Sequence, residues 1–279
     1  QLQDIDTVVV VTAQHREMLD QVLALFRIEP QYDLNLMKRQ QDLYSITCGV
    51  LEGLKSIFEQ EKPDLVLVHG DTTTTLAASL AAFYQRIPLG HVEAGLRTRN
   101  KYSPYPEEIN RTLTGKLADL HFAPTDAARD NLLAEAVAPF KIWVTGNTVI
   151  DALLQTIRPD YQFASVFTGI DFTHRILVVT THRRENWGAR MGEIYRALID
   201  LVNEFPDIEV VFPVHRNPVV RDLAIEMLQG RERFHLLEPL DYEPFAHLMN
   251  ASYLVLTDSG GMQEEAPSLG KPVMVLRDT

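Results

Sequence analysis

Residues 254–276, with the sequence LVLTDSGGMQEEAPSLGKPVMVL, begin and end as hydrophobic strand and hold two adjacent glycines between the strands. Ser259, Gly260 and Gly261 stand where the first strand gives way to a helical segment. A helix N-terminus at this point would present N–H groups and the positive end of the helix dipole, which suit a phosphate. The stretch therefore predicts a strand, turn, helix and strand of an α/β fold, with an anion site at the turn.

The same alternation recurs along the whole chain. Short runs rich in Val, Ile and Leu are each followed by a longer amphipathic segment; they are TVVVVT, DLVLVHG, IPLGHVE, DLHFAP and KIWVTG in the first half, and RILVVTTH, IEVVFPVH, RFHLLEP, YLVLTD and PVMVLRD in the second. Continuous apolar strands separated by helices are typical of parallel sheets covered on both faces. We expect two Rossmann-like doubly wound domains, residues 1–146 and 147–279, that face each other across a cleft at the carboxyl ends of their strands.

Composition narrows the class of protein. The chain has 279 residues, of which 46% are hydrophobic and 23% charged, so it is globular and long enough for two domains. Its net charge of −12 opposes binding to nucleic acid and to acidic membrane surfaces. Cys48 is the only cysteine, which excludes an internal disulfide. With no apolar run of about 18 residues and no signal peptide before the first strand, we expect a cytoplasmic protein.

Polar residues follow several of the predicted strands, and their charges divide between the two halves. Acids gather in the first half and cations in the second, a division that suits a ligand with one anionic end and one neutral end at which protons move. The residues at these strand ends are His69, Asp71, His91 and Glu93 in the first half and His182, Arg183, Arg184, His215 and Arg216 in the second.

Each acid also has a simpler structural explanation. Asp71 precedes the helical run TTTTLAASLAAFY and would serve as its N-cap. Glu93 would form a buried ion pair with Arg97 or Arg99. Glu107 lies just after a proline, where an acid is favourable in the first turn of any helix.

Several familiar chemistries are excluded by their missing motifs. The sequence has no Walker A loop, no G-x-G-x-x-G, no H-E-x-x-H, no C-x-x-C and no G-x-S-x-G. The histidines fall on separate strands without ligand spacing, so we expect no structural metal. Dinucleotide-binding, metalloprotease and α/β-hydrolase functions lose their support.

Nine segments, taken together and in order, carry a resemblance to a known family. They are TAQHREML, VHGDTTTTLAASLAAFY, GHVEAGLRT, YSPYPEEINRTLTG, FAPT, VTGNTVIDAL, THRREN, PVHRNP and LTDSGGMQEEAPSLGKPV. From about residue 7 to the last residue, the chain resembles the bacterial non-hydrolysing UDP-N-acetylglucosamine 2-epimerases. The resemblance implies a glycosyltransferase-B-like fold, a homodimer, and an isomerase that needs no cofactor and no metal.

The resemblance also implies a reaction. Members of the family interconvert UDP-N-acetylglucosamine and UDP-N-acetylmannosamine by eliminating UDP to give a 2-acetamidoglucal and adding UDP back. The product feeds cell-envelope polysaccharide synthesis. Position by position, the resemblance implies catalytic roles for Asp71, Glu93, Glu107 and His182. It implies UDP binding by Ser259, Gly260, Gly261, Glu265, Phe245 and Arg183. It further implies an activator site, for a second UDP-N-acetylglucosamine, at Gln14, Gln41, Glu107, Arg183 and His215.

Members of the family begin with a strand and a Gly-Thr-Arg-Pro-Glu loop, and the sequence from Gln1 onward contains neither. We therefore expect the first strand and loop of the first domain to be missing, and a polypeptide that starts at Gln1 to bind substrate weakly and turn it over slowly. Three other functions stay open at this point: a hydrolysing 2-epimerase, a retaining glycosyltransferase, and a nucleotide-sugar sensor without turnover. Which carboxylate acts as the base, and whether the activator site operates, also stay open.

Overall fold

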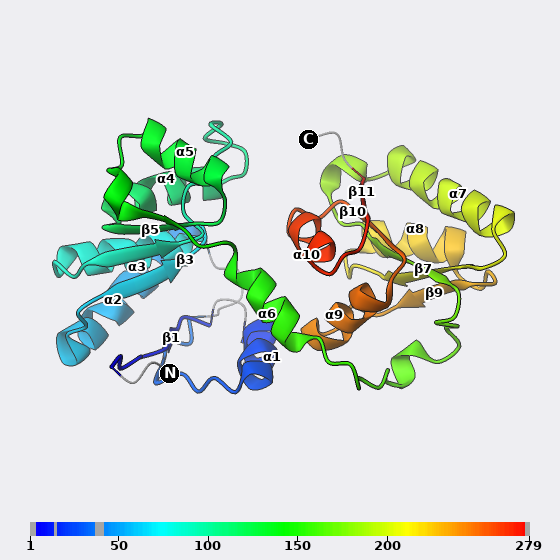
Figure 1. Ribbon diagram of the computed structural model, residues 1–279, viewed down its shortest axis with the longest axis horizontal. Helices are drawn as coiled ribbons and strands as arrows, with labels where there is room; N and C mark the ends of the chain where they lie inside the picture. The colour runs from blue at the N-terminus through cyan, green and yellow to red at the C-terminus, as the bar shows by residue number, and fades with distance from the viewer. Residues whose placement is uncertain (1–3, 14–15, 37–41, 277–279) are drawn as a thin grey trace. The chain divides into compact units, whose positions relative to one another are not determined.

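The computed structural model describes residues 4–13, 16–36 and 42–276, and the chain divides into two compact units. Unit 1 spans residues 1–147 and unit 2 spans residues 148–279; unit 1 runs from blue to green in Figure 1, and unit 2 from green to red. Every strand pair in the described part of the chain is parallel, with helices between the strands. The α/β class with parallel sheets, predicted from the continuous apolar strands, is therefore confirmed.

Unit 1 contains a four-stranded sheet in the order β3-β4-β5-β6 and a two-stranded sheet of β1 and β2. Its strands are β1 Val10–Val11, β2 Tyr32–Asp33, β3 Val66–His69, β4 Leu89–Val92, β5 Leu120–Ala123 and β6 Ile142–Val144. Its helices are α1 Arg16–Phe26, α2 Leu43–Glu61, α3 Thr73–Tyr84, α4 Glu107–Leu117 and α5 Asp126–Ala134. Each apolar run of the first half contains one of these strands. Strand β2 was not predicted, because two residues are too few for a periodic pattern.

Helix α2 shows why these segments fold as they do. Its N-cap Asp42 accepts a hydrogen bond from the Ser45 N–H, and the Ser45 side chain accepts one from the Asp42 N–H, so the first turn is closed by a reciprocal capping box. Residues at three- and four-residue spacing, among them Val50, Leu54 and Ile57, are buried and place one apolar face of the helix in the core of unit 1.

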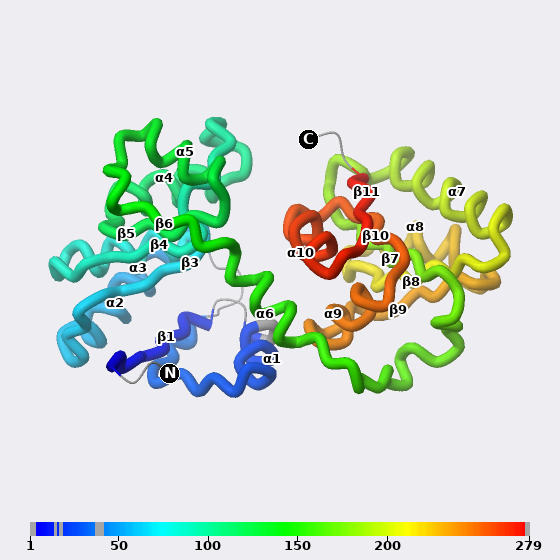
Figure 2. The backbone as a smooth tube through the Cα atoms, viewed as in Figure 1, coloured from blue at the N-terminus to red at the C-terminus, as the bar shows by residue number. Residues whose placement is uncertain are grey.

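Unit 2 contains a five-stranded sheet in the order β11-β10-β7-β8-β9. Its strands are β7 Arg175–Thr180, β8 Ile208–Pro213, β9 Phe234–Leu237, β10 Leu254–Thr257 and β11 Val273–Val275. Its helices are α6 Thr148–Thr156, α7 Ala189–Glu204, α8 Pro218–Leu228, α9 Tyr242–Ala251 and α10 Met262–Ser268. Figure 2 follows the backbone from β6 into α6, the first helix of this unit. The central strands β7 and β8 are buried along most of their length, as expected for a sheet covered by helices on both faces.

The strand order of unit 2 marks where a ligand site is expected. The first strand, β7, is flanked by β8 on one side and by β10 on the other, so the chain reverses direction across the sheet at β7. In doubly wound sheets, ligands bind beyond the carboxyl ends of the strands on either side of this reversal. In unit 2 those ends are Thr180 on β7 and Thr257 on β10, which are register partners.

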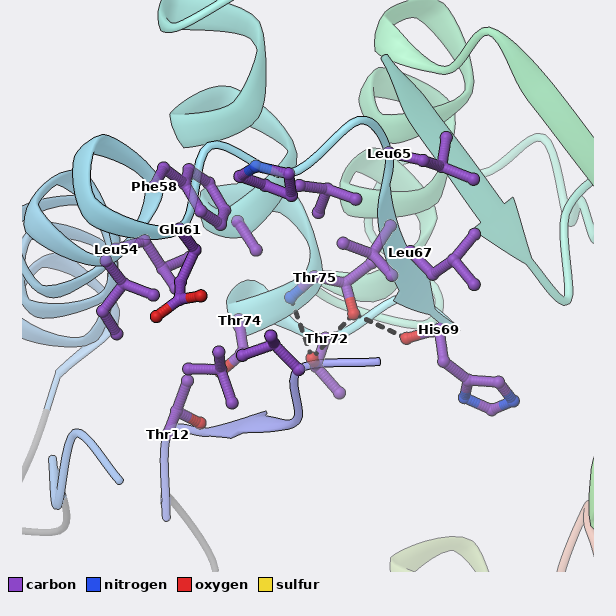
Figure 3. Close-up of a pocket in the computed structure, with 17 residues that line it drawn as sticks. Thr12, Leu54, Phe58, Glu61, Leu65, Leu67, His69, Thr72, Thr74 and Thr75 are labelled. Carbon is purple, nitrogen blue, oxygen red and sulfur yellow. Dashed lines mark hydrogen bonds between the residues drawn. The ribbon is translucent and has the colours of Figure 1, made fainter. Parts of the chain in front are cut away.

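In unit 1, a gap between the two-stranded sheet and the four-stranded sheet interrupts the corresponding strand order. Strand β1 pairs with β2 and β3 pairs with β4, and between β1 and β3 lies a cavity of about 360 Å³, which Figure 3 shows in close-up. By strand order, this is the position that β7 occupies in unit 2. Apolar side chains of β3 and of the segment that leads into β1 line the cavity and are exposed, Leu67 on β3 by 59% and Val8 just before β1 by 41%.

Candidate active site

Asp71 lies in the turn between β3 and α3, at the carboxyl end of the first sheet. The N-cap of α3 is Thr72, whose hydroxyl accepts a hydrogen bond from the Thr75 N–H, so the capping explanation of Asp71 is wrong. Helix α4 holds Asp71 twice instead. The Arg111 Nη2 lies 3.1 Å from Asp71 Oδ2, and the Asn110 side-chain amide donates a 2.9 Å hydrogen bond to the Asp71 carbonyl oxygen. The carboxylate and the main chain of Asp71 are thus both fixed.

Glu93 directly follows β4, which pairs with β3 in the sheet. Its backbone has a φ of 65°, in the left-handed region that a residue with a side chain adopts only at a cost and that recurs at functional sites. Its carboxylate Oε2 lies 3.9 Å from His69 Nε2. Arg97, one of the two arginines expected to pair with Glu93, has its guanidinium on Glu135, with an Nε to Oε1 distance of 2.6 Å. Asp71 and Glu93 therefore lie at the ends of two neighbouring strands.

Glu107 is the first residue of α4, the helix that holds Asp71. Its neighbour Glu108 is buried and accepts hydrogen bonds from the backbone N–H groups of Thr98 and Arg99. Burial alone would raise the pKa of Glu108, but these bonds and the nearby Arg111 charge outweigh it and hold the pKa below its ordinary value. Of the two consecutive glutamates, Glu108 fastens a loop, while Glu107 is half-buried and stays a predicted site residue.

In unit 2, the candidate His182 is bound to a fully buried aspartate. Asp258 has no exposed surface, and its Oδ1 lies 3.0 Å from His182 Nδ1. The same carboxylate accepts hydrogen bonds from the N–H groups of His182 and Arg183 and from the Asn186 side-chain amide. The His215 ring stacks near His182 with centroids 5.9 Å apart. Asp258 thus fixes the imidazole of His182 together with the turn that carries it.

Asp258 is a site residue that the sequence reasoning missed. Burial alone would raise its pKa, but its hydrogen-bond donors, His182 first, together outweigh burial and lower the pKa to about 2. The signal that identified Asp71 was present here as well, because Asp258 directly follows the buried strand LVLT at residues 254–257. Arg111 gave no such signal, because its partner Asp71 lies 40 positions earlier in the sequence.

The glycines that follow Asp258 have no explanation within the described chain. Neither Gly260 nor Gly261 is among the residues with positive φ, and a Cβ added at either would meet no atom within 4 Å. The Ser259 N–H donates to Thr257 Oγ1, which leaves the Ser259 hydroxyl and the glycine N–H groups as candidates to bind a phosphate. Glu265 lies in the first turn of α10, and burial, with the charge of Glu264, raises its pKa.

The remaining predicted residues are Arg183 and Phe245 in unit 2 and two glutamines of unit 1. Arg183 is half-buried beside His182, and its Nε has no hydrogen-bond partner among the described residues. Phe245 lies in the first turn of α9, where its ring packs against the core and its N–H donates to the Asp241 carbonyl oxygen. The predicted activator residues Gln14 and Gln41 lie outside the described residues.

Within residues 4–13, 16–36 and 42–276, no group of three or more His, Cys, Asp or Glu side chains is arranged to hold a metal ion. Over the same residues, no helix combines the length and the apolar character needed to cross a membrane.

Comparison with known proteins defines the class of this chain. The profile of the UDP-N-acetylglucosamine 2-epimerase family matches residues 1–279. The UDP-N-acetylglucosamine 2-epimerase of Escherichia coli is 58% identical over 278 residues, which cover 97% of this chain and 74% of that protein. The crystal structure of UDP-GlcNAc 2-epimerase from Neisseria meningitidis bound to UDP-GlcNAc matches with a TM-score of 0.89 and 52% identity, over 99% of this chain and 76% of that one. The S. aureus MnaA co-structure with UDP matches with a TM-score of 0.86 and 49% identity, over 99% and 73%.

Two parallel-sheet units with polar residues at their strand ends form an α/β architecture that the matched 2-epimerase structures share. The chain belongs to the UDP-N-acetylglucosamine 2-epimerase family, and it is an isomerase. The resemblance identified from its nine sequence segments is confirmed.

Proposed function

We propose that this protein converts UDP-N-acetylglucosamine reversibly into UDP-N-acetylmannosamine by eliminating UDP to a 2-acetamidoglucal and adding UDP back at C1 with inversion at C2. The observation that carries the proposal is the division of charge: carboxylates stand at the strand ends of unit 1, and a histidine, an arginine and a glycine turn stand at those of unit 2. We propose that the acids act on the sugar and that the glycine turn binds the diphosphate.

The chemistry requires charge to be stabilised at two places. Lengthening of the C1–O bond places positive charge on the sugar ring and makes the C2 proton easier to remove. Carboxylates beside the ring favour this oxocarbenium-like state, as they do in glycosidases. We propose that Asp71, Glu93 and Glu107 stabilise the ring and move the C2 proton.

The departing diphosphate needs donors of hydrogen bonds at the other end. We propose that His182, held by Asp258, and the turn from Ser259 to Gly261 receive it, with Arg183 adding positive charge. Two glycines without positive φ and without crowding are expected where a ligand approaches the backbone closely. Glu265 is proposed to accept hydrogen bonds from the ribose hydroxyls, and the backbone near Phe245 to meet the uracil.

Three further features of the proposal follow from the resemblance. The protein acts as a cytoplasmic homodimer, so light scattering should report twice the 31.7 kDa mass of one chain. A second UDP-N-acetylglucosamine acts as an activator, with Gln14, Gln41, Glu107, Arg183 and His215 as its proposed contacts. Its binding would make the initial rate depend sigmoidally on substrate concentration, and a hyperbolic dependence would count against the activator.

The reaction is tested by incubating the protein with UDP-N-acetylglucosamine in D₂O and recording proton spectra. Epimerisation gives UDP-N-acetylmannosamine with deuterium at C2, hydrolysis gives UDP and free sugar, and a sensor leaves the substrate unlabelled. Asp71→Asn and Glu93→Gln should suppress the exchange by about a hundredfold while UDP binding persists. Asp126→Asn, at an exposed position in α5, removes an acid of the same unit and should exchange at the parental rate.

A further inference from the structure

His91 lies in the middle of β4, inside the first sheet. Its register partners are Val68 on β3 and His121 on β5, and only 1% of its surface is exposed. Its Nε2 lies 2.8 Å from the carbonyl oxygen of Gly70. Because a carbonyl oxygen can only accept, Nε2 must carry the proton, and the imidazole is held in one tautomer. Burial lowers the pKa of His91 to about 4, so the ring is neutral at physiological pH.

The imidazole is an unfavourable way to fill this position. Its Nδ1 is buried and has no hydrogen-bond partner among the described residues, and a buried polar atom without a partner destabilises a fold. An apolar side chain of similar volume, like that of the buried Leu89 on the same strand, would avoid this loss. What the ring contributes in return is the bond to Gly70.

The hydrogen bond from His91 holds a turn that adjoins two of the proposed catalytic acids. Gly70 has a φ of 70°, its N–H donates to the Val92 carbonyl oxygen, and its own carbonyl accepts from His91, so β4 holds both polar groups of this residue. Asp71 follows Gly70, and Glu93 follows Val92. A Cβ added to Gly70 would lie 3.3 Å from Glu93 Oε2, which puts the Glu93 carboxylate directly against the turn.

The far side of the same turn is held by another buried residue. The Asn110 amide donates to the carbonyl oxygen of Asp71, the residue next to Gly70. Two consecutive carbonyl groups are therefore fixed by side chains from two different elements, β4 and α4. A turn held in this way keeps Asp71 at a set separation from Glu93, and catalytic efficiency falls steeply when reacting groups are displaced.

We propose that His91 is a positioning residue, whose hydrogen bond to Gly70 fixes Asp71 relative to Glu93 for proton transfer at C2. The inference rests on the proposed function, because it assumes that these two acids move the proton. His91 itself contacts no reacting atom in this scheme. It acts through the backbone of the turn.

The test compares two substitutions at this position. His91→Leu removes the donor at similar volume, and we expect kcat to fall about tenfold while KM changes by less than about twofold. His91→Gln places a side-chain N–H near the position of Nε2, and we expect it to restore most of the lost kcat. A purely structural histidine would show no such rescue, because either substitution would then act only through packing.

His121 supplies the matched control. It is the register partner of His91 on β5, is equally buried, and has its pKa lowered by burial too, but its imidazole lies beside the backbone of Ala118. His121→Leu should therefore leave kcat within about twofold of the parent. An equal loss of kcat in His91→Leu and His121→Leu, or a loss that His91→Gln does not reverse, would overturn the proposal.

A readout without catalysis separates this inference from the proposed function. In ¹H–¹⁵N spectra, the amide signals of Asp71 and Glu93 should shift in His91→Leu and return in His91→Gln. If the parent protein does not epimerise the sugar, the proposed function is wrong, and the positioning of the turn is then judged by these signals alone. Amide signals that stay in place in His91→Leu would refute the positioning role.

Discussion

Replacing Asp258 with asparagine should destabilise unit 2 by about 2–4 kcal/mol at neutral pH. Folding lowers the pKa of this carboxyl from 3.8 to about 2, close to two pKa units, and each unit corresponds to about 1.4 kcal/mol. Asparagine removes the charge and also turns a side-chain N–H group toward three groups that are themselves donors. This second effect adds the cost of donors left without an acceptor. The loss worked out from the pKa alone is therefore a lower bound.

The pH dependence has a definite sign. Because the pKa of Asp258 is lower in the folded state, its contribution is fully present above about pH 4 and is lost as the pH falls toward about 2. The difference between the parent and Asp258→Asn should therefore shrink at pH 3. Asp207→Asn is the control, because Asp207 is an exposed acid of the same unit that pairs with Arg175, and its loss should cost much less.

The two tryptophans make the measurement specific for each unit. Trp143 lies on β6 in unit 1 and Trp187 follows the turn held by Asp258 in unit 2. In a Trp143→Phe background, urea unfolding followed by fluorescence reports on unit 2 alone. A loss below about 1 kcal/mol at pH 7, or one that is the same at pH 3, would refute the view that Asp258 is a charged anchor.

Three further predictions concern the glycine turn, the buried glutamate and the cavity of unit 1. Gly260→Ala should weaken UDP binding in calorimetry and leave stability unchanged, whereas Gly270→Ala, at a φ of 71°, should lower stability and leave UDP binding unchanged. Glu108→Gln should destabilise unit 1 at neutral pH and less so at pH 3, because its pKa is lowered in the fold; Trp143 fluorescence in a Trp187→Phe background measures it. An added N-terminal segment that fills the cavity as a strand should stabilise unit 1 by about 2–5 kcal/mol, and Leu67→Lys should reduce that gain by about 1.5–3 kcal/mol, the contribution of burying one such side chain.

The strands, and the acids at their ends, could be predicted because the sequence pattern that indicates each one lies within a few residues of it. All ten apolar runs contain a strand, since continuous burial on both faces leaves a local pattern of Val, Ile and Leu. Asp71 and Glu93, two acids at strand ends, were found by the same rule. Strand β2 escaped it, because Tyr32–Asp33 is held by pairing with β1 rather than by its own pattern.

The residues that hold the candidate site were harder to predict because their partners are distant in sequence. Arg111 binds Asp71, and Asn186 binds Asp258 from 72 positions away. In each case, the residues next to the two partners in the sequence give no indication of the contact. Asp71 illustrates the limit well, because the sequence alone left N-capping as a plausible role, and only the structure shows that Thr72 is the cap.

The carboxylates of the candidate site are of two kinds, buried and half-exposed, and the two kinds differ in how well they are suited to carry a proton. Glu108 and Asp258 are buried, accept hydrogen bonds from backbone N–H groups, and have lowered pKa values, so protonating either would break bonds that hold a loop in place. Such groups are poor proton carriers, because each transfer would destabilise the site that performs it. Asp71 and Glu93 lie at the strand ends with 30% and 25% of their side chains exposed, so a substrate can reach their carboxylates. Proton transfer at C2 should therefore depend on the second kind, and the first kind should affect the rate only through the geometry that it maintains.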